Sequence, residues 1–171
     1  MTQNNGFVPI EPFSSDLNCF ACGSRNPFGL HMTFASDGHS VLSTVTLPNH
    51  LCGWGNLIHG GIITTLLDEI MSWTAIHLLR RLILTRSMET RFILPVAPNT
   101  ALRVQGWVDR QMKNTEAVIS AALYNDDGQV CARSTGHFAL LHAKMMRRLK
   151  IMDEQTIADF EKRYEQGGVK L

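Results

Sequence analysis

The chain has 171 residues, of which 44% are hydrophobic and 18% charged, and its formal net charge is +1. This length is typical of one domain, which buries roughly two-thirds of the surface that the unfolded chain exposes. A charge so close to zero provides no summed field for a polyanion, so nucleic acid is not expected as a partner. No cationic segment followed by an apolar run opens the chain, and charged residues interrupt its most apolar stretch, residues 58–84. We therefore expect a cytoplasmic protein without a signal peptide or a membrane span.

The four cysteines are Cys19, Cys22, Cys52 and Cys131. In a chain of this length without an export signal, we expect thiols rather than a disulfide framework. Cys19 and Cys22 have the spacing of half a zinc site, but no second CxxC or HxxxH follows to complete a tetrahedron. Cys52, Cys131 or His31 could contribute from a distance, yet the sequence favours no metal. A redox role is also disfavoured, because the pair does not follow a βαβ pattern.

The first elements are a leader, a hairpin and a helix. Residues 1–29 are rich in Asn, Pro, Ser and Gly and predict a leader segment that lies over the surface, with ordered strands beginning after it. Strands at residues 30–35 and 41–47 flank the turn Asp37-Gly38 and predict a hairpin. After the loop 48–56, one long helix is predicted over about residues 60–79. Its apolar stripe recurs at three and four residue steps. The stripe consists of Ile63, Leu66, Leu67, Ile70, Met71, Thr74 and His77.

Four further strands are predicted after this helix, separated by clear turn signals. They cover residues 82–94, 101–110, 116–125 and 129–141. Alternation of apolar and polar residues in the second and third favours an antiparallel sheet with one covered face. Residues 145–166 predict an amphipathic helix that ends at Gly167-Gly168.

The order β-β-α-β-β-β-β predicts an α+β fold, with one central helix packed against a strongly curved antiparallel sheet. We divide the chain into a leader (1–29), a main domain (30–143) and a C-terminal helical extension (144–171). A sheet wrapped on one helix leaves edge strands exposed, and pairing such edges across a two-fold axis is a common remedy. A homodimer is therefore expected.

The residues with chemical potential lie at the start of the long helix. Gly60 and Gly61 leave backbone N–H groups bare at a helix N-terminus, where they carry partial positive charge and could polarise a carbonyl oxygen. Alternatively, the two glycines only let the helix start under a crowded sheet. Asp68 lies two turns further on in an apolar stretch, so its carboxylate must be paired, hydrogen-bonded or functional. Glu69, about 100° around the helix, is expected to face a polar neighbour or solvent.

Helix geometry constrains how these groups could cooperate. Seven residues separate Gly61 from Asp68, which corresponds to about 10 Å along the helix. If both act on one carbonyl, they must come from different subunits. His59 is interpreted either as an N-cap neighbour packed under the sheet or as a polar group that orients loop and substrate. Asn56 is either a further donor near the oxyanion or a turn residue.

At these residues the sequence resembles the hotdog-fold acyl-CoA thioesterase superfamily, in particular the phenylacetyl-CoA and hydroxybenzoyl-CoA thioesterase branch. The resemblance covers about residues 18–141. It rests on Cys19-Phe20-x-Cys22-Gly23-x-x-Asn26-Pro27-x-Gly29-Leu30, His59-Gly60-Gly61 with Asp68 nine residues after His59, Arg91-Phe92-Ile93-Leu94-Pro95-Val96, and the turn Asp127-Gly128 followed by Ala132 and Gly136.

The resemblance implies a curved antiparallel sheet wrapped around one long helix, a homodimer or a dimer of dimers (homotetramer), and acyl-CoA hydrolysis without a metal or other cofactor. Asp68 matches the family's catalytic acidic residue, acting as a general base on water or as a nucleophile that gives a mixed anhydride. Gly60 and Gly61 match the oxyanion donors. Thr85 falls where relatives place a Ser or Thr that holds the attacking water, although the segment 85–88 is more polar than the usual strand start.

Coenzyme A, as part of the substrate, brings phosphates that cationic side chains can bind, although long cationic side chains also commonly occupy solvated faces. The candidates are Arg80, Arg81, Arg86 and Arg91, together with Lys144, Arg147, Arg148 and Lys150. The acyl pocket candidates, which are equally compatible with plain core, are Trp54, Leu67, Met71 and Trp73. Two other functions stay open: a non-catalytic acyl-CoA-binding hotdog protein, and a hotdog acyl-CoA hydratase or dehydratase.

Overall fold

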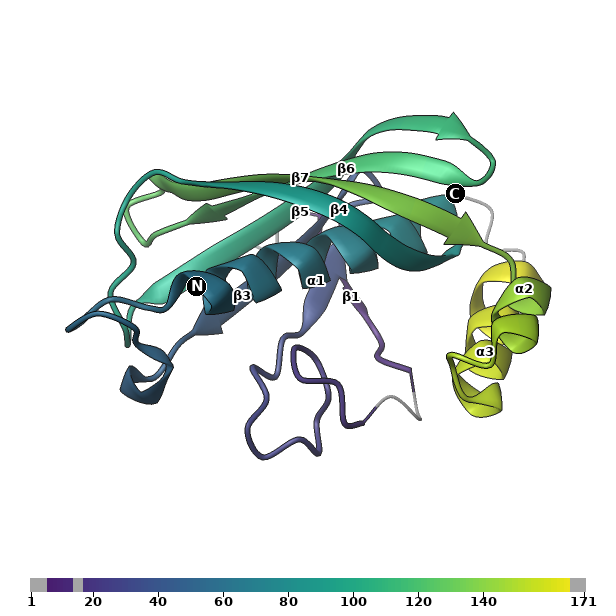
Figure 1. Ribbon diagram of the computed structural model, residues 1–171, viewed down its shortest axis with the longest axis horizontal. Coiled ribbons are helices and arrows are strands. Elements are labelled where there is room, and N and C mark those ends of the chain that lie inside the picture. Colours follow the sequence, from purple (N-terminus) through teal and green to yellow (C-terminus); the bar gives the residue numbers. More distant parts are fainter. Residues whose placement is uncertain (1–5, 14–16, 167–171) are drawn as a thin grey trace.

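The structure is a computed structural model that describes residues 6–13 and 17–166. Within these residues, seven antiparallel strands form one curved sheet in the order β1-β2-β3-β5-β6-β7-β4. The long helix α1 lies along one side of the sheet, and the short helices α2 and α3 lie beyond one end of it (Figure 1). The strands are β1 (Val8–Ile10), β2 (Phe34–Ser36), β3 (Ser40–Thr46), β4 (Leu82–Phe92), β5 (Ala101–Lys113), β6 (Glu116–Tyr124) and β7 (Val130–Leu141). The predicted α+β architecture is confirmed.

The leader contributes more to the fold than the sequence predicted. Its strand β1 pairs with β2 at the edge of the sheet, so the expectation that strands begin only after residue 29 was wrong. Strand β2 begins at Phe34 instead of Leu30, because the backbone N–H groups of Leu30 and Met32 bond to leader carbonyls. The predicted turn is confirmed, since Asp37 Oδ1 accepts hydrogen bonds from the backbone N–H groups of His39 and Ser40, at 2.9 and 2.7 Å.

Helix α1 (Gly60–Leu79) has the predicted bounds, and its apolar stripe is buried except for the half-buried His77. Gly106 of β5 allows the helix to approach the sheet closely, because a Cβ at this position would lie 3.1 Å from the Ile70 carbonyl oxygen and collide with the Thr74 hydroxyl. By length and composition alone, α1 could cross a membrane. In the fold it is the core helix that packs against the sheet, which explains its apolar composition.

Strand β6 departs from the predicted alternation, because all its residues between the two ends are buried. On the side away from α1 it carries small residues such as Ser120. The Ser120 hydroxyl bonds to Asp109 of β5 and lies 2.9 Å from Thr135 Oγ1 of β7. Side chains of the neighbouring strands thus cover this central strand on the outer face, and the prediction of one covered face was wrong for β6.

The C-terminal segment is not the single helix predicted for residues 145–166. It forms α2 (Ala143–Leu149), α3 (Glu154–Phe160) and the continuation η2 (Glu161–Gln166). The break occurs at Lys150, which adopts a left-handed conformation with φ 53°. A new helix starts after Asp153, whose side chain accepts a bond from the Thr156 N–H at 2.8 Å. The predicted end at Gly167-Gly168 lies outside the described residues.

Candidate functional site

His59 is the N-cap of α1, and its ring accepts a hydrogen bond from the Gly61 N–H. The Gly61 nitrogen lies 2.9 Å from His59 Nδ1, so the second ring nitrogen, Nε2, carries the proton in the neutral imidazole. The His59 side chain is exposed, and the interpretation that it packs under the sheet was wrong. Because the Gly61 N–H already has an acceptor, this glycine is not a ready oxyanion donor in the single chain.

The Gly60 N–H is the remaining backbone donor of the glycine pair. Among residues 6–13 and 17–166 it has no hydrogen-bond acceptor. The ring of Phe92, on the end of β4, lies against Gly60, with 3.3 Å between an idealised Cβ and the ring. This N–H therefore lies at a helix N-terminus, where the helix dipole places partial positive charge, and the partly exposed ring of Phe92 is close by. Asn56 is exposed in the turn that Leu57 closes onto Trp54, which fits its interpretation as a turn residue.

Asp68 and Thr85 lie together on the side of α1 that faces β4. Thr85 Oγ1 donates a hydrogen bond to Asp68 Oδ1 at 2.9 Å. The register of β4 against β7 shifts between Thr85 and Ser87, so the polar segment that looked unusual in the sequence is a β-bulge. Bulges re-aim side chains and occur frequently beside active sites. Burial raises the pKa of the Asp68 carboxyl, an effect that the Thr85 hydrogen bond partly opposes.

Glu69 occupies a different environment on the adjacent side of α1. Its Oε1 accepts a hydrogen bond from Trp73 Nε1 at 3.0 Å and lies 3.9 Å from the Cys19 sulfur. Burial, followed by the nearby Cys19, raises the pKa of Glu69 to about 7. The sequence expectation of a polar neighbour or solvent did not identify the leader as that neighbour. The only sequence signal for this contact was the CxxC pair itself.

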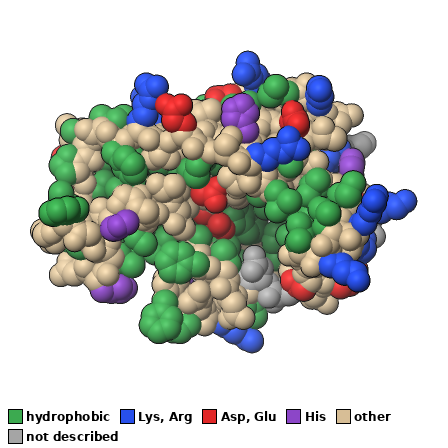
Figure 2. All heavy atoms as spheres, in the orientation of Figure 1, with side chains coloured by type: hydrophobic (Ala, Val, Ile, Leu, Met, Phe, Trp, Pro, Cys, Tyr) green, Lys and Arg blue, Asp and Glu red, His purple; other side chains and the backbone are tan. Residues whose placement is uncertain are grey.

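One chain does not bring all the candidate groups together. Gly60 and Asp68 are eight residues apart on α1, which is about 12 Å along the helix axis. Figure 2 shows acidic side chains in the middle of the face that carries α1, bordered by hydrophobic side chains. Several exposed apolar residues continue this surface around the start of α1 and the end of β4. They include Trp54, Leu57, Phe92, Ile93 and Leu94.

The candidate cationic residues are distributed over the surface rather than gathered at the helix start. Arg86 forms an ion pair with Glu116 at 2.7 Å, and Arg91 one with Glu89 at 3.1 Å. Arg80 and Arg81 follow the C-terminal end of α1. Arg147 is bound by both Glu154 and Glu161, so it is a structural cation of the C-terminal helices.

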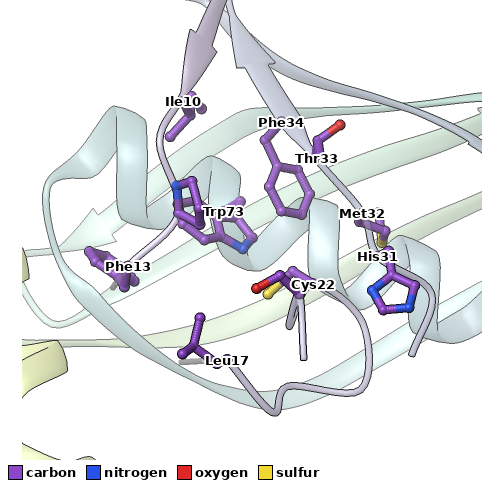
Figure 3. A pocket seen from close by; sticks show the side chains of 11 residues that line it. Ile10, Phe13, Leu17, Cys22, His31, Met32, Thr33, Phe34 and Trp73 are labelled. Atoms are coloured by element: carbon purple, nitrogen blue, oxygen red, sulfur yellow. The ribbon is translucent and has the colours of Figure 1, made fainter. Parts of the chain in front are cut away.

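The candidate acyl-pocket residues lie in different environments and do not line one pocket in the single chain. Trp54 is 89% exposed, so it lines no pocket in the single chain. Leu67 and Met71 are fully buried core residues. Trp73 lines a cavity of ≈ 210 Å³ between α1, β2 and the leader, together with Phe34 of β2 and leader residues such as Phe13 and Leu17 (Figure 3).

Comparison with known proteins shows which proteins the chain resembles. Residues 55–132 match the family model of the thioesterase superfamily. A solved thioesterase superfamily protein shares 26% sequence identity with a TM-score of 0.65, and the match covers 72% of this chain and 60% of that one. A hypothetical thioesterase from Streptococcus pneumoniae TIGR4, solved with coenzyme A, shares 20% identity, TM-score 0.57, over 60% of this chain and 81% of that one. The E. coli PaaI protein from the phenylacetic acid degradation operon shares 17% sequence identity with a TM-score of 0.60, and the match covers 66% of this chain and 80% of that one.

The fold is thus the hotdog fold, and the predicted resemblance to the thioesterase superfamily is confirmed. The two structures below 25% identity support the fold alone. The chain spans 60% of the length of the first of these proteins. No protein in the curated set matches the sequence.

Proposed function

We propose that this protein is an acyl-CoA thioesterase whose active site forms between two copies of the chain. The observation that carries the proposal is the hydrogen bond from Thr85 to Asp68 on the exposed side of α1. It holds a carboxylate of raised pKa in one orientation within a fold of the thioesterase superfamily. A carboxylate held in this way is suited to accept a proton from water.

In this mechanism, Asp68 takes a proton from a water molecule whose oxygen attacks the thioester carbon. Thr85 occupies Oδ1, and no residue within the described ranges bonds to Oδ2, which leaves that oxygen for the water. The C=O bond becomes a single bond to an oxyanion, and the Gly60 N–H of the partner copy donates to it. Collapse of this intermediate breaks the C–S bond, and the thiolate of coenzyme A leaves with a proton from Asp68. The alternative is direct attack by Asp68 Oδ2 on the thioester carbon, which breaks the C–S bond, releases the thiolate of coenzyme A and gives a mixed anhydride that water then hydrolyses.

The shared site follows from distance and from exposed surface. Because one chain separates the Gly60 N–H from Asp68 by about 12 Å, a second, antiparallel α1 is needed to place both on one carbonyl. The strand β4 is an 11-residue edge of the sheet with an exposed central segment, and such edges are usually paired or covered. Apolar side chains such as Phe92 and Ile93, 56% and 52% exposed, lie at its end. These features support a homodimer, or a dimer of dimers, as the active form.

Coenzyme A as part of the substrate is proposed by analogy with the hypothetical thioesterase from Streptococcus pneumoniae, which has a similar fold and was solved with coenzyme A. Arg86 and Arg91 would each have to exchange a carboxylate for one of its phosphates, and Arg81 already donates a hydrogen bond to the Arg80 carbonyl at 2.9 Å.

The test is a panel of acyl-CoAs with free-thiol release as the readout, applied to the wild type and to Asp68→Asn. We expect thiol release by the wild type and a loss of about 10²–10⁴-fold in kcat for Asp68→Asn. The matched control Asp126→Asn, at an exposed turn, should retain wild-type rates. Ligand binding without thiol release would instead support an acyl-CoA-binding protein, and hydration of an enoyl-CoA would support a hydratase.

Complementation tests the shared site. Gly60→Pro and Asp68→Ala subunits are each expected to be inactive alone. In mixed dimers, one of the two sites would combine an intact Gly60 with an intact Asp68, so random mixing should restore up to about a quarter of wild-type activity. Absence of recovery in mixed dimers proven by mass spectrometry would contradict a site shared between subunits.

A further inference from the structure

The CxxC pair of the leader forms a cluster with the Glu69 carboxylate, on the side of α1 adjacent to the one that carries Asp68. The sulfur atoms of Cys19 and Cys22 and a carboxylate oxygen of Glu69 all lie within 4.8 Å of one another. The sequence suggested half a zinc site without a second half. Glu69, about 50 residues later in the chain, is a third donor that the sequence spacing could not reveal.

The distances are close to those of a tetrahedral metal site. With a Zn–S bond of about 2.3 Å and a Zn–O bond of about 2.0 Å, ligand atoms lie about 3.5–3.8 Å apart. The Cys19 sulfur is 3.9 Å from Glu69 Oε1. Side-chain movements of about 1 Å or less would therefore bring the three donors onto one ion.

The backbone of the leader presents the two thiols from a closed loop. The Gly23 N–H bonds to the Cys19 carbonyl at 2.9 Å, and the Met32 N–H bonds to the Ala21 carbonyl at 2.9 Å. A Cβ at position 23 would collide with the backbone of Leu17 and Cys19, so the loop closes this tightly only around a glycine. The thiols thus reach Glu69 from a loop that is ordered by its own hydrogen bonds.

The chemistry of the donors also fits a cation. Two thiols and a carboxylate share a part-buried space, where a charged carboxylate is costly unless a positive charge or hydrogen bonds compensate it. Thiolate and carboxylate ligands together suit Zn²⁺ and related divalent ions. Cys22 also lines the cavity shared with Phe34 and Trp73 (Figure 3), so a fourth coordination position would face that cavity.

We propose that Cys19, Cys22 and Glu69 bind one Zn²⁺ ion, which clamps the leader onto α1 beside the catalytic face. Binding forms two Zn–S bonds and one Zn–O bond, and the two thiol protons pass to solvent. A water molecule or a small ligand from the cavity completes the tetrahedron. The proposal is independent of the thioesterase mechanism, because the ion would act on the leader and not on the thioester.

Cobalt binding tests the proposal with a spectroscopic readout that needs no substrate. Untagged, full-length protein is reduced, treated with a chelator and titrated with CoCl₂. We expect a thiolate-to-cobalt charge-transfer band in the near ultraviolet and visible d–d bands of a tetrahedral ion. Both should saturate at one ion per chain, and ZnCl₂ should displace them. Absence of the band while the thiols are shown to be reduced would overturn the proposal.

Matched variants assign the ligands. Cys19→Ser, Cys22→Ser and Glu69→Gln should each lose the band at equimolar cobalt, and Glu69→Gln retains an oxygen that can accept the bond from Trp73. Cys52→Ser removes a thiol elsewhere and should leave the band unchanged. A band that persists in Glu69→Gln, or that disappears in Cys52→Ser, would contradict the assignment.

Alkylation of the wild type provides a test without substitutions. ZnCl₂ should slow the modification of Cys19 and Cys22 by iodoacetamide, as mapped by peptide mass spectrometry, while the half-buried Cys52 reacts at an unchanged rate. Equal rates with and without ZnCl₂ would count against metal binding. If Cys19 and Cys22 are recovered as a disulfide from protein purified without exposure to air, this would favour a redox pair and overturn the metal assignment.

Discussion

Two adjacent carboxylates on α1 have entirely different surroundings. Asp68 faces the edge strand β4, where a threonine hydroxyl bonds to it and the surface stays open. Glu69, one residue later and about 100° around the helix, faces the leader, where an indole N–H and two thiols surround it. The comparison shows that the role of a helix carboxylate depends on which segment covers it. An open, singly hydrogen-bonded carboxylate is suited to act on a substrate, and a covered one is suited to hold the fold or an ion.

On the open side, the largest expected effect after the loss of the Asp68 carboxylate concerns Gly60. Gly60→Pro removes the N–H, and proline is well tolerated at the first position of a helix. His59 already has the extended conformation, φ −60° and ψ 135°, that a following proline requires. We expect kcat to fall by about 10²–10³-fold, the typical effect of losing one oxyanion donor.

Gly60→Ala is the control for this substitution, because it keeps the N–H and adds a Cβ that contacts the Phe92 ring. Steady-state kinetics should show a much smaller loss for alanine than for proline. Equal losses would indicate that the crowding at Phe92, and not the N–H, determines the rate.

The next effect concerns Thr85. Thr85→Val removes the hydroxyl that donates to Asp68 but keeps the shape of the side chain. A hydrogen bond to a charged group contributes about 1.5–3 kcal/mol, so we expect kcat to fall by about 10–150-fold. Thr85→Ser keeps the donor and should stay close to the wild type in the same assay. A wild-type rate for Thr85→Val would remove Thr85 from the site.

On the covered side, Trp73→Phe keeps an aromatic ring between Phe13 and Phe34 but deletes the N–H that donates to Glu69. We expect the free energy of unfolding, measured in urea, to fall by about 1–3 kcal/mol, because the part-buried carboxylate loses a donor. The leader should also become more sensitive to proteolysis, with thioesterase activity much less affected. Trp54→Phe, at an exposed position, is the control, and an equal effect there would contradict the role of the indole N–H.

The smallest expected effect is a pH dependence of the free energy of unfolding, and it arises from His77 in the last turn of α1. Burial, together with the facing cations Arg163 and Arg80, lowers the pKa of His77 below its ordinary value of 6.5, and Tyr164 bonds to its ring. In the interval between the lowered and the ordinary pKa, the unfolded chain binds more protons than the folded one. Stability therefore rises with pH through this interval and is lost as the pH falls below about 6.5.

Urea unfolding at about pH 7.5 and about pH 5.5 measures this dependence. The difference in unfolding free energy between the two conditions should shrink in His77→Gln. His39→Gln, at an exposed turn, should keep the wild-type difference. A difference that is unchanged in His77→Gln would assign the pH dependence to other groups.

Much of the fold could be predicted because its signals are local. The 3.6-residue periodicity located α1 with its observed bounds, and the Asp37-Gly38 and Asn125–Gly128 turns located two hairpins. The prediction failed where the decisive contact was distant. Strand β1 has only three residues and exists because β2 pairs with it. The break of the C-terminal helix depends on the left-handed residue Lys150, for which the helical periodicity carried no signal.

The candidate site shows the same division. The sequence motif placed His59, Gly60 and Asp68 on one helix, and the resemblance pointed to Thr85. The sequence could not reveal that the His59 ring accepts a hydrogen bond from the Gly61 N–H, because the rotamer of a capping side chain is set by the loop that holds it. Likewise, the polarity around Thr85 looked unfavourable until the bulge in β4 explained it.

The sequence by itself determined the class of fold, the long helix and the family resemblance, because periodicity, turn residues and motif spacing act within short segments of the chain. Only the tertiary structure decided which neighbour each carboxylate meets: a hydroxyl from β4 for Asp68, and the thiols of the leader for Glu69. The physical reason is that a helix turns 100° per residue, so adjacent side chains point to different neighbours, and those neighbours come from distant parts of the chain.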